Sequence, residues 1–475
     1  MKAKSWLRLF CLMCAAVFLC GGVLVWYVDP FFHYHAPHDE RFFYPLDNER
    51  SMNDGILRHF DYDAIVTGTS LAACFRTSEL DALFGVRSVK IPASGASYFE
   101  INNLINTGLE ARPETKLVFR SLDRHLLLYG GDAMRNDLGE YPAYLYDRNP
   151  FNDYKYLFNA DVLFGRCLGM LLDAARPGFV PGRTSFDDYS NTMPAYRGAF
   201  GLPDIQELLR FDVGAVGEPI HLSDALREET ARKIRQNVIA VAEAHPDVTF
   251  YCFFTPVSLG WWHDRIALGD IYAQIEAEQL AAEMMLQCGN IRLFDFSGRT
   301  DIISDVNQYR DLMHYGEWIN SLMLKWMHDD QYRLTAENVR DFFASRLAYY
   351  LTADYESLLT QERWGCDYYA AALLNEELTG AVPRRLDDGE FRNGRLSLPD
   401  AGEYSYLCFE ACGAEPEERL EIGVCDENGA LLERTEETYR GGWQRFAVDL
   451  REIGGPAEIV LDGGPAFEYR SFVLY

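Results

Sequence analysis

The strongest constraint on this 475-residue chain is an uninterrupted apolar segment near its N-terminus. Residues 9–28 carry no charge, and Lys2, Lys4 and Arg8 precede them. Twenty residues in an α-helix rise about 30 Å, which is the thickness of the hydrocarbon core of a bilayer. Because the flanking cations favour a cytoplasmic N-terminus, residues 1–28 are predicted to be a cytoplasmic tip and a single-pass membrane anchor, with the bulk of the chain outside.

A cleaved signal peptide is the alternative interpretation of this segment. Signal peptides have an apolar region of about 7–15 residues and a small-x-small cleavage site, and this segment fits both features poorly. Lipid attachment at Cys20 is a weaker alternative, because the large Leu19 precedes it. Trp26 and Tyr27 occupy the position of an aromatic belt, which favours the uncleaved anchor.

Composition excludes several classes of protein. The chain is 48% hydrophobic and 24% charged, so it can bury a large core, and its length predicts two or three domains. A net charge of −28 argues against nucleic acid as a partner. Outside the apolar segment no two cysteines have the Cys-x-x-Cys spacing of a zinc site, so neither a metal nor a cofactor is expected. Whether Cys408 or Cys412 pairs with Cys425 stays open, because spacing does not fix the distances between them.

The residue composition and the hydrophobic pattern of the chain change several times after the anchor. Residues 29–60 are rich in aromatic and turn-forming residues and predict a packed connector. In residues 61–330, β-branched runs alternate with amphipathic segments, which is typical of a doubly wound parallel sheet. The expected strands are 64–67, 88–91, 117–122, 249–254 and 291–296, and the expected helices are 70–84, 98–111, 223–244 (capped by Ser223) and 264–287. The interval of about 125–221 is predicted to be an insertion near the mouth of the sheet.

The C-terminal third is predicted to contain two further regions. Residues 331–382 form a helical brace in this prediction, with Thr335 capping its first helix. In residues 383–475, short apolar runs alternate with turns and no helical pattern intervenes, which predicts an antiparallel β-sandwich. Glu427-Asn428-Gly429 is a strong hairpin signal within it.

The first candidate for a catalytic residue follows the end of the expected strand at 64–67. Gly68-Thr69-Ser70 follows this strand and precedes a predicted helix. At the carboxyl end of a parallel strand a side chain faces the ligand crevice, and a helix N-terminus there offers N–H groups to an oxyanion. Ser70 is therefore a candidate nucleophile, and the structural alternative is that it is only a helix cap.

A carboxylate and an imidazole lie far downstream, three residues apart. Asp311 and His314 open an amphipathic segment that runs to about residue 327, where they can face the same side. Asp311 could then orient His314 through one ring nitrogen and leave the other nitrogen for Ser70. Such a set supplies a nucleophile, a base and an orienting group, although Asp-x-x-His alone is more often a surface pair.

The combined pattern resembles the SGNH or GDSL-type hydrolases. Gly68-Thr69-Ser70 matches the first block of that family, Ser94-Gly95-Ala96 matches the second, and Asp311 with His314 matches the last. The resemblance implies a flavodoxin-like doubly wound sheet. It also implies that Ser70 is the nucleophile, His314 the base and Asp311 the orienting group, with the amides of Ser70 and Gly95 as oxyanion donors.

The third block departs from the family pattern. The family usually has Gly-x-Asn-Asp, whereas residues 119–125 contain no asparagine, so a specialised substrate is expected. Other polar or aromatic residues are then predicted to line the pocket. These candidates are Thr69, Ser121, Asp123, Trp261, Trp262 and Tyr315. The two tryptophans could stack on a sugar ring, but paired tryptophans more often pack in an interior.

The layout from the anchor to Ser70 resembles membrane-anchored bacterial members of this superfamily, similar to the lipoteichoic-acid D-alanylation protein and to polysaccharide O-acetyltransferases. The resemblance implies an O-acyltransferase or O-acylesterase that acts on acylated glycans or cell-wall polymers outside the bacterial cell membrane. The anchor favours transfer, in which an integral-membrane partner donates the acyl group and the insertion excludes water.

The C-terminal region resembles jelly-roll carbohydrate-binding modules, and a purely structural module is the alternative. A catalytically inactive glycan-binding or envelope-assembly protein is the alternative for the whole chain. The missing asparagine and the β-sandwich motivate that alternative.

Overall fold

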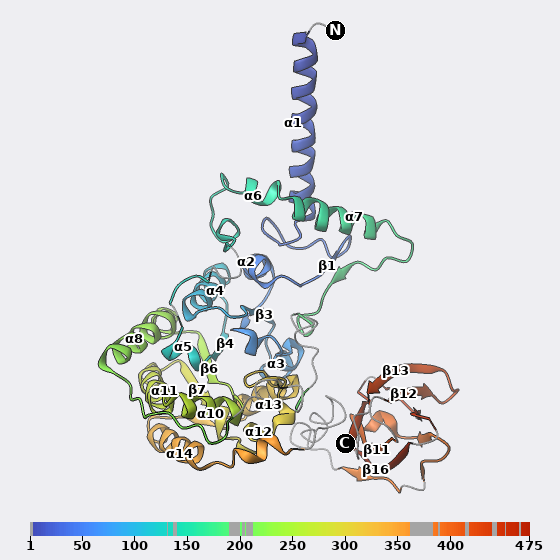
Figure 1. Cartoon of the computed structure of the whole chain (residues 1–475). Coiled ribbons are helices and arrows are strands. Elements are labelled where there is room, and N and C mark those ends of the chain that lie inside the picture. Colours follow the sequence, from blue (N-terminus) through green and yellow to red (C-terminus); the bar gives the residue numbers. More distant parts are fainter. Residues whose placement is uncertain are drawn as a thin grey trace.

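A computed structural model describes residues 3–130, 132–135, 140–189, 200–201, 205, 212–361, 383–387, 390–413, 418–438, 444–451, 453–464 and 467–475. It contains an apolar N-terminal helix, a mixed α/β region around a largely parallel sheet, and two separate antiparallel sheets near the C-terminus (Figure 1). The part of the predicted brace at 362–382 lies outside the described residues.

The N-terminal helix α1 (Ala3–Val28) projects from the rest of the molecule (Figure 1). Within the described residues it is the one helix long and apolar enough to cross a membrane, over Lys4–Val28. Its side chains are exposed over most of this length, but Val25 and Val28 are buried against the connector. The connector contributes a short strand, β1 (Phe43–Tyr44), and the helix α2 (Glu49–His59).

The central sheet has the strand order β3-β2-β4-β6-β7-β8 in the described residues. Its first five strands are parallel, and β8 pairs antiparallel with β7. The residues of β2 and β3 are all buried, because helices cover both faces of a parallel sheet. The strands are β2 (Ala64–Gly68), β3 (Ser88–Pro92), β4 (Leu117–Leu122), β6 (Thr249–Phe254), β7 (Ile291–Asp295) and β8 (Arg333–Leu334).

Two of the expected helix boundaries are confirmed by the helices around this sheet. The helix α4 begins and ends where the pattern predicts, and the Ser223 side chain caps α8 by accepting the Leu226 amide. The main helices are α3 (Thr77–Phe84), α4 (Tyr98–Ala111), α8 (Asp224–Ile234), α10 (Leu259–Leu268), α11 (Ile271–Met285), α13 (Glu317–His328) and α14 (Val339–Thr352). Two shorter segments, η6 (Arg235–Ile239) and α9 (Ala240–Ala244), continue α8 to the predicted end of that helix.

Three other helix predictions are wrong in part. The expected helix at 70–84 is a single 3₁₀ turn, η1 (Ser70–Ala72), followed by α3. The expected helix at 264–287 is two helices, because the chain turns at Gly269 between α10 and α11. Thr335 does not cap the next helix, since α14 begins at Val339 after Asn338.

The C-terminal region consists of two four-stranded antiparallel sheets in the described residues, with the orders β10-β15-β12-β13 and β14-β11-β16-β9. The hairpin predicted at 427–429 joins β12 to β13, where Asp426 accepts the amides of Asn428 and Ala430. The strands are β9 (Arg384–Arg385), β10 (Arg395–Leu398), β11 (Tyr406–Cys412), β12 (Arg419–Asp426), β13 (Leu431–Thr438), β14 (Gln444–Asp449), β15 (Ala457–Asp462) and β16 (Glu468–Leu474). In the described part of the chain, Cys425 forms no disulfide with Cys408 or Cys412.

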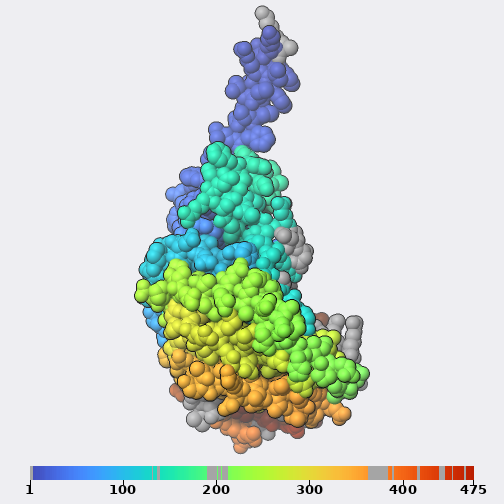
Figure 2. All heavy atoms as spheres, turned by 90° about the vertical axis from the view of Figure 1, so that its left-hand side faces the viewer, coloured from blue at the N-terminus to red at the C-terminus, as the bar shows by residue number. Residues whose placement is uncertain are grey.

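The insertion was expected to lie near the mouth of the sheet, but one part of it lies elsewhere. The segments α6 (Tyr154–Leu157), η3 (Asp161–Cys167) and α7 (Leu168–Ala174) cross the base of α1 (Figure 1). The ring of Phe158 packs edge-on against Phe18 of α1, with the ring centroids 5.6 Å apart. Apolar contact with α1 therefore fixes this part of the insertion, and the space-filling view shows it below the projecting helix (Figure 2).

Candidate active site

Ser70 lies immediately beyond the carboxyl end of β2, where the strand order of the sheet reverses. Open α/β sheets bind ligands in the crevice at such a switch point. The chain reaches Ser70 through Gly68, which has a φ of 155° and whose Cα lies against the hydroxyl of Ser121. A Cβ at this position would overlap that hydroxyl, so only glycine fits.

The structure brings Ser70, His314 and Asp311 into one hydrogen-bonded chain. Ser70 Oγ lies 2.8 Å from His314 Nε2, and His314 Nδ1 lies 2.7 Å from Asp311 Oδ2. The His314 and Asp311 side chains are 25% and 34% exposed, and Ser70 is half-buried. All three groups can therefore be reached from solvent, while their catalytic role stays a prediction.

Asp311 and His314 lie in a loop and not on the helix that was expected. The loop runs between Tyr309 and Tyr315, which form an antiparallel bridge, and α13 begins only at Glu317. The other carboxylate oxygen of Asp311 accepts the amides of Met313 at 2.8 Å and His314 at 2.7 Å. The Asp311 carboxylate thus stabilises the conformation of its own loop and also binds the imidazole of His314.

The Leu71 carbonyl joins this loop to the turn that carries Ser70. The Leu71 carbonyl, next to Ser70, accepts the hydroxyl of Tyr315 and the side-chain amide of Asn320, each at 3.3 Å. Tyr315 is only 3% exposed, so it supports the site from behind and does not line a pocket. These bonds fix the separation of the serine and the histidine.

The protonation of Asp311 suits an orienting role. Burial alone would raise the pKa of Asp311, but hydrogen bonds and the charge of His314, together with the Met313 amide, hold it below its ordinary value of 3.8. Asp311 is therefore ionised at neutral pH and accepts a hydrogen bond from the Nδ1–H group of His314. Nε2 is then left to accept the hydroxyl proton of Ser70.

A backbone hydrogen bond joins the loops that carry Ser70 and Gly95. The Ala93 amide donates to the Gly68 carbonyl at 2.9 Å, which holds the loop after β3 against the loop after β2. Among the described residues, the amides of Ser70 and Gly95 donate to no protein acceptor. Their role as oxyanion donors, which the resemblance implies, stays a prediction.

Arg135 lies beside Gly95, and the sequence did not single it out. Its guanidinium packs on the Cα of Gly95, where a Cβ would overlap it. The Arg135 backbone is held on both sides, because its amide donates to Glu100 at 3.0 Å and its carbonyl accepts from Arg50 at 2.9 Å. Arg135 belongs to an insertion without periodic pattern, so no spacing signal could have identified it. This part of the insertion does lie near the mouth of the sheet.

Three of the predicted pocket residues are buried supports. Thr69 donates its hydroxyl to the carboxyl group of Asp123, and each residue is 2% exposed. Burial raises the pKa of Asp123, while the charges of His125 and His314 and the Thr69 hydrogen bond oppose the rise. Ser121 is fully buried behind Gly68. These residues shape the turn that carries Ser70 and leave no surface for a ligand.

Trp261 and Trp262 belong to the interior, which is the alternative that the sequence left open. They are 5% and 0% exposed. The Trp262 ring stacks on Tyr350 of α14, with the ring centroids 4.0 Å apart. Neither ring can stack on a sugar in this arrangement.

A buried charge network holds the loop after β4. Arg124, next to Asp123, donates to Glu278 and, at 2.6 Å, to Asp295, and all three side chains are at most 1% exposed. The Gln274 side chain donates to the Arg124 carbonyl at 2.9 Å and to Glu278 at 2.8 Å. Burial raises the pKa of Glu278 from 4.5 to about 7, with Arg124 opposing the rise and Asp295 adding to it.

This raised pKa predicts a pH dependence of stability. Between pH 5 and 7 the folded protein holds a proton on Glu278 that the unfolded chain releases, so this group makes the free energy of unfolding fall as the pH rises. The expected fall is about 2 kcal/mol over this interval, and Glu278→Gln should remove it. Urea unfolding at both pH values measures the difference. Glu283→Gln on the same helix is the control, because the pKa of Glu283 is lowered and its contribution has the opposite sign. An unchanged pH dependence in Glu278→Gln would contradict the assignment.

No group of three or more His, Cys, Asp or Glu side chains in the described part of the chain is placed to hold a metal ion. Comparison with protein-family models found no match for the sequence, and comparison with curated proteins found none either. The functional argument therefore depends on the geometry of the site.

Proposed function

We propose that this protein is a membrane-tethered serine acyl-ester enzyme of the SGNH type. The hydrogen-bonded chain from Ser70 through His314 to Asp311 carries the proposal, because it joins a nucleophile, a base and an orienting group at a sheet switch point. The strand order supports it. Numbered along the chain, the five parallel strands have the order 2-1-3-4-5, which is the flavodoxin-like order.

In this mechanism Ser70 Oγ attacks the carbonyl carbon of an ester while His314 Nε2 takes its proton. The amides of Ser70 and Gly95 donate to the oxyanion of the tetrahedral intermediate. The alcohol then leaves with the proton from His314, and the acyl group stays on Ser70. A water molecule or a sugar hydroxyl, activated by His314, releases the acyl group as free acid or as a new ester.

Arg135 offers a substitute for the asparagine that the third block lacks. It lies against Gly95 and so next to one of the two free amides. A guanidinium is a stronger hydrogen-bond donor to an anion than a neutral amide side chain. We infer that Arg135 donates to the oxyanion or to an anionic group of the substrate.

The anchor suggests where the reaction takes place. With α1 spanning the bilayer and the N-terminus in the cytoplasm, Ser70 acts outside the bacterial cell membrane, on acylated glycans or cell-wall polymers. Tethering favours acyl transfer from an integral-membrane partner over hydrolysis, because a scavenging esterase gains nothing from it. The two C-terminal sheets would form a jelly-roll-like module that holds the glycan.

Labelling with a fluorophosphonate tests the nucleophile directly. The full-length protein in detergent is expected to become labelled at Ser70, because His314 activates this hydroxyl. Ser70→Ala should abolish labelling and His314→Ala should nearly abolish it. Ser304→Ala should leave it unchanged, because the half-buried Ser304 donates its hydroxyl to the Thr300 carbonyl and has no part in the proposed site. Failure of the wild-type protein to label would favour the non-catalytic alternative.

A further inference from the structure

Beside α1 lies a group of exposed apolar side chains that the catalytic proposal does not use. They belong to the insertion, and their exposed fractions range from 41% to 89%. We name this group the apolar face. Its members are Phe151, Tyr154, Phe158, Phe164, Leu168 and Leu172.

The helix formed by η3 and α7 buries Val162, Cys167 and Met170, as a surface helix normally does, but it also carries a second apolar stripe. Its exposed side carries Phe164, Leu168 and Leu172, which follow one another at four-residue spacing. A surface helix normally turns such a stripe towards the core and its polar side towards water. Here the stripe points outward, so some other apolar medium is expected to cover it.

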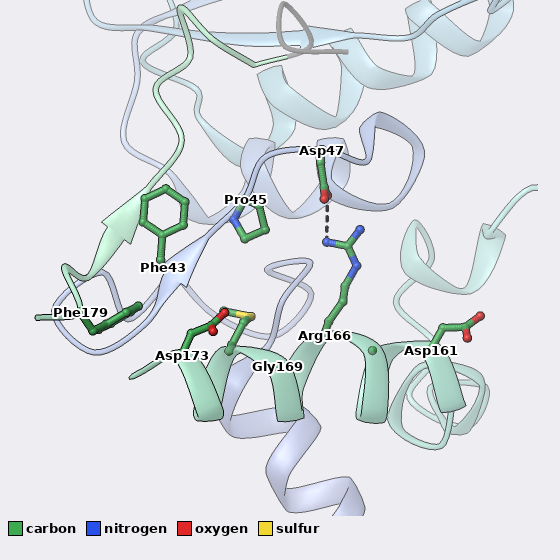
Figure 3. A pocket seen from close by; sticks show the side chains of 10 residues that line it. Phe43, Pro45, Asp47, Asp161, Arg166, Gly169, Asp173 and Phe179 are labelled. Carbon is green, nitrogen blue, oxygen red and sulfur yellow. Dashed lines mark ion pairs between the residues drawn. The ribbon is translucent and has the colours of Figure 1, made fainter. Parts of the chain in front are cut away.

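Another side of the same helix, which carries three charged residues together with Met170, faces β1. Asp161, Arg166 and Asp173 line a cleft of about 500 Å³ between this helix and β1 (Figure 3). Across this cleft, Arg166 Nη1 lies 2.8 Å from Asp47 Oδ1 in an ion pair. The close-up shows α1 leaving from the other side of the helix, away from the cleft (Figure 3). The helix thus separates this cleft from the side on which α1 projects.

The position of the apolar face along α1 identifies the medium. Trp6 and Trp26 are both more than half exposed, and their twenty-residue separation corresponds to about 30 Å, the thickness of the hydrocarbon core. Phe158 contacts Phe18 and approaches Gly22, which lie eight and four residues before Trp26. This contact is therefore about 6–12 Å inside the boundary that Trp26 marks. Interfacial helices bury their apolar sides to a similar depth, about 5–10 Å.

We propose that the apolar face lies in the lipid leaflet on the side of the folded domain, so that η3 and α7 form an interfacial helix beside the anchor. This inference depends on α1 spanning the bilayer and is independent of the catalytic proposal. Lys155 and Arg176 are exposed and adjacent in sequence to the face, where their long side chains can reach lipid phosphates. The anchor α1 and this interfacial helix would then contact the membrane in different directions. Together they would fix the orientation of the α/β region over the bilayer.

Photo-crosslinking of the full-length chain in phosphatidylcholine and phosphatidylglycerol nanodiscs tests this. The probe is p-benzoylphenylalanine in place of Leu172, Phe164 or Leu12 of α1, with lipid adducts measured by mass spectrometry. Leu268 is the matched control, because it is a leucine at the end of α10 with the same exposed fraction as Leu172, 58%. Melting temperatures in detergent check that each variant is folded.

Lipid adducts are expected at 12, 164 and 172, with yields at the last two about tenfold or more above the yield at 268, because inserted residues are surrounded by acyl chains. Adducts at 12 alone would overturn the interfacial helix and leave the anchor intact. Adducts at none of these positions would overturn both. Crosslinks from 164 and 172 to a protein in native membranes, without lipid adducts, would assign the face to a protein partner and also overturn the proposal.

Discussion

Replacing Ser70 with alanine is expected to lower kcat/KM for ester cleavage by a factor on the order of 10⁴ to 10⁶, with the fold retained. In the proposed mechanism this hydroxyl forms the acyl-enzyme, since it lies 2.8 Å from His314 Nε2 at the switch point of the sheet. Steady-state rates on p-nitrophenyl acetate and on acetylated glycans measure the loss.

The other two members of the set should act as a unit with Ser70. His314→Ala is expected to cost nearly as much as Ser70→Ala, and the double variant should cost little more than either, because one acyl transfer needs both groups. Asp311→Asn should cost less, since the imidazole stays in place with weaker control of its tautomer. Ser304→Ala is the control for a lost hydroxyl. Full activity in Ser70→Ala would show that another nucleophile carries the reaction.

Arg124→Met is expected to lower the free energy of unfolding at neutral pH by about 3–5 kcal/mol. The substitution leaves Glu278 and Asp295 buried together without their cation. Protonation of these carboxyl groups relieves the repulsion, so the loss should become smaller as the pH falls from 7 to 5. Urea unfolding at both pH values measures the loss and its pH dependence.

Arg120→Met is the matched comparison. Arg120 is also fully buried, but its guanidinium donates only to the carbonyls of Asn237 and Tyr98. Its removal leaves uncharged acceptors without a donor, so we expect a smaller loss, about 1–3 kcal/mol, without the same pH dependence. Equal losses in the two variants would mean that packing, and not the buried charges, determines the effect.

The fold was predictable where one pattern determines the structure. The segments 117–122 and 249–254 are buried on both faces, and they are rich in apolar residues, as such strands are. This composition predicts β4 and β6 with the bounds that the structure has. The strand β13 was missed, because Leu431–Thr438 is an exposed edge strand with several charges and no alternation. Only its pairing with β12 defines it as a strand.

The site was predictable to the extent that it depends on short local motifs. Spacing and order within the chain were enough to expect Ser70, Asp311 and His314 together. They could not show that Asp311 and His314 occupy a loop, because a tertiary bond to Leu71 and not a helix sets their position. Arg135 depends on the path of an aperiodic insertion, which no local rule predicts.

The contact between Ser70 and His314 joins residues 244 positions apart. Closing a loop of this length costs chain entropy, which contacts made earlier in the sheet must offset before the pair can form. The strands β6 and β7 lie between the two residues in the sequence, so the sheet has to be assembled first. A chain that is still leaving the ribosome or crossing the membrane therefore carries Ser70 without its histidine partner. The hydrogen bond on which the proposed activation depends forms only after the segment around His314 has folded.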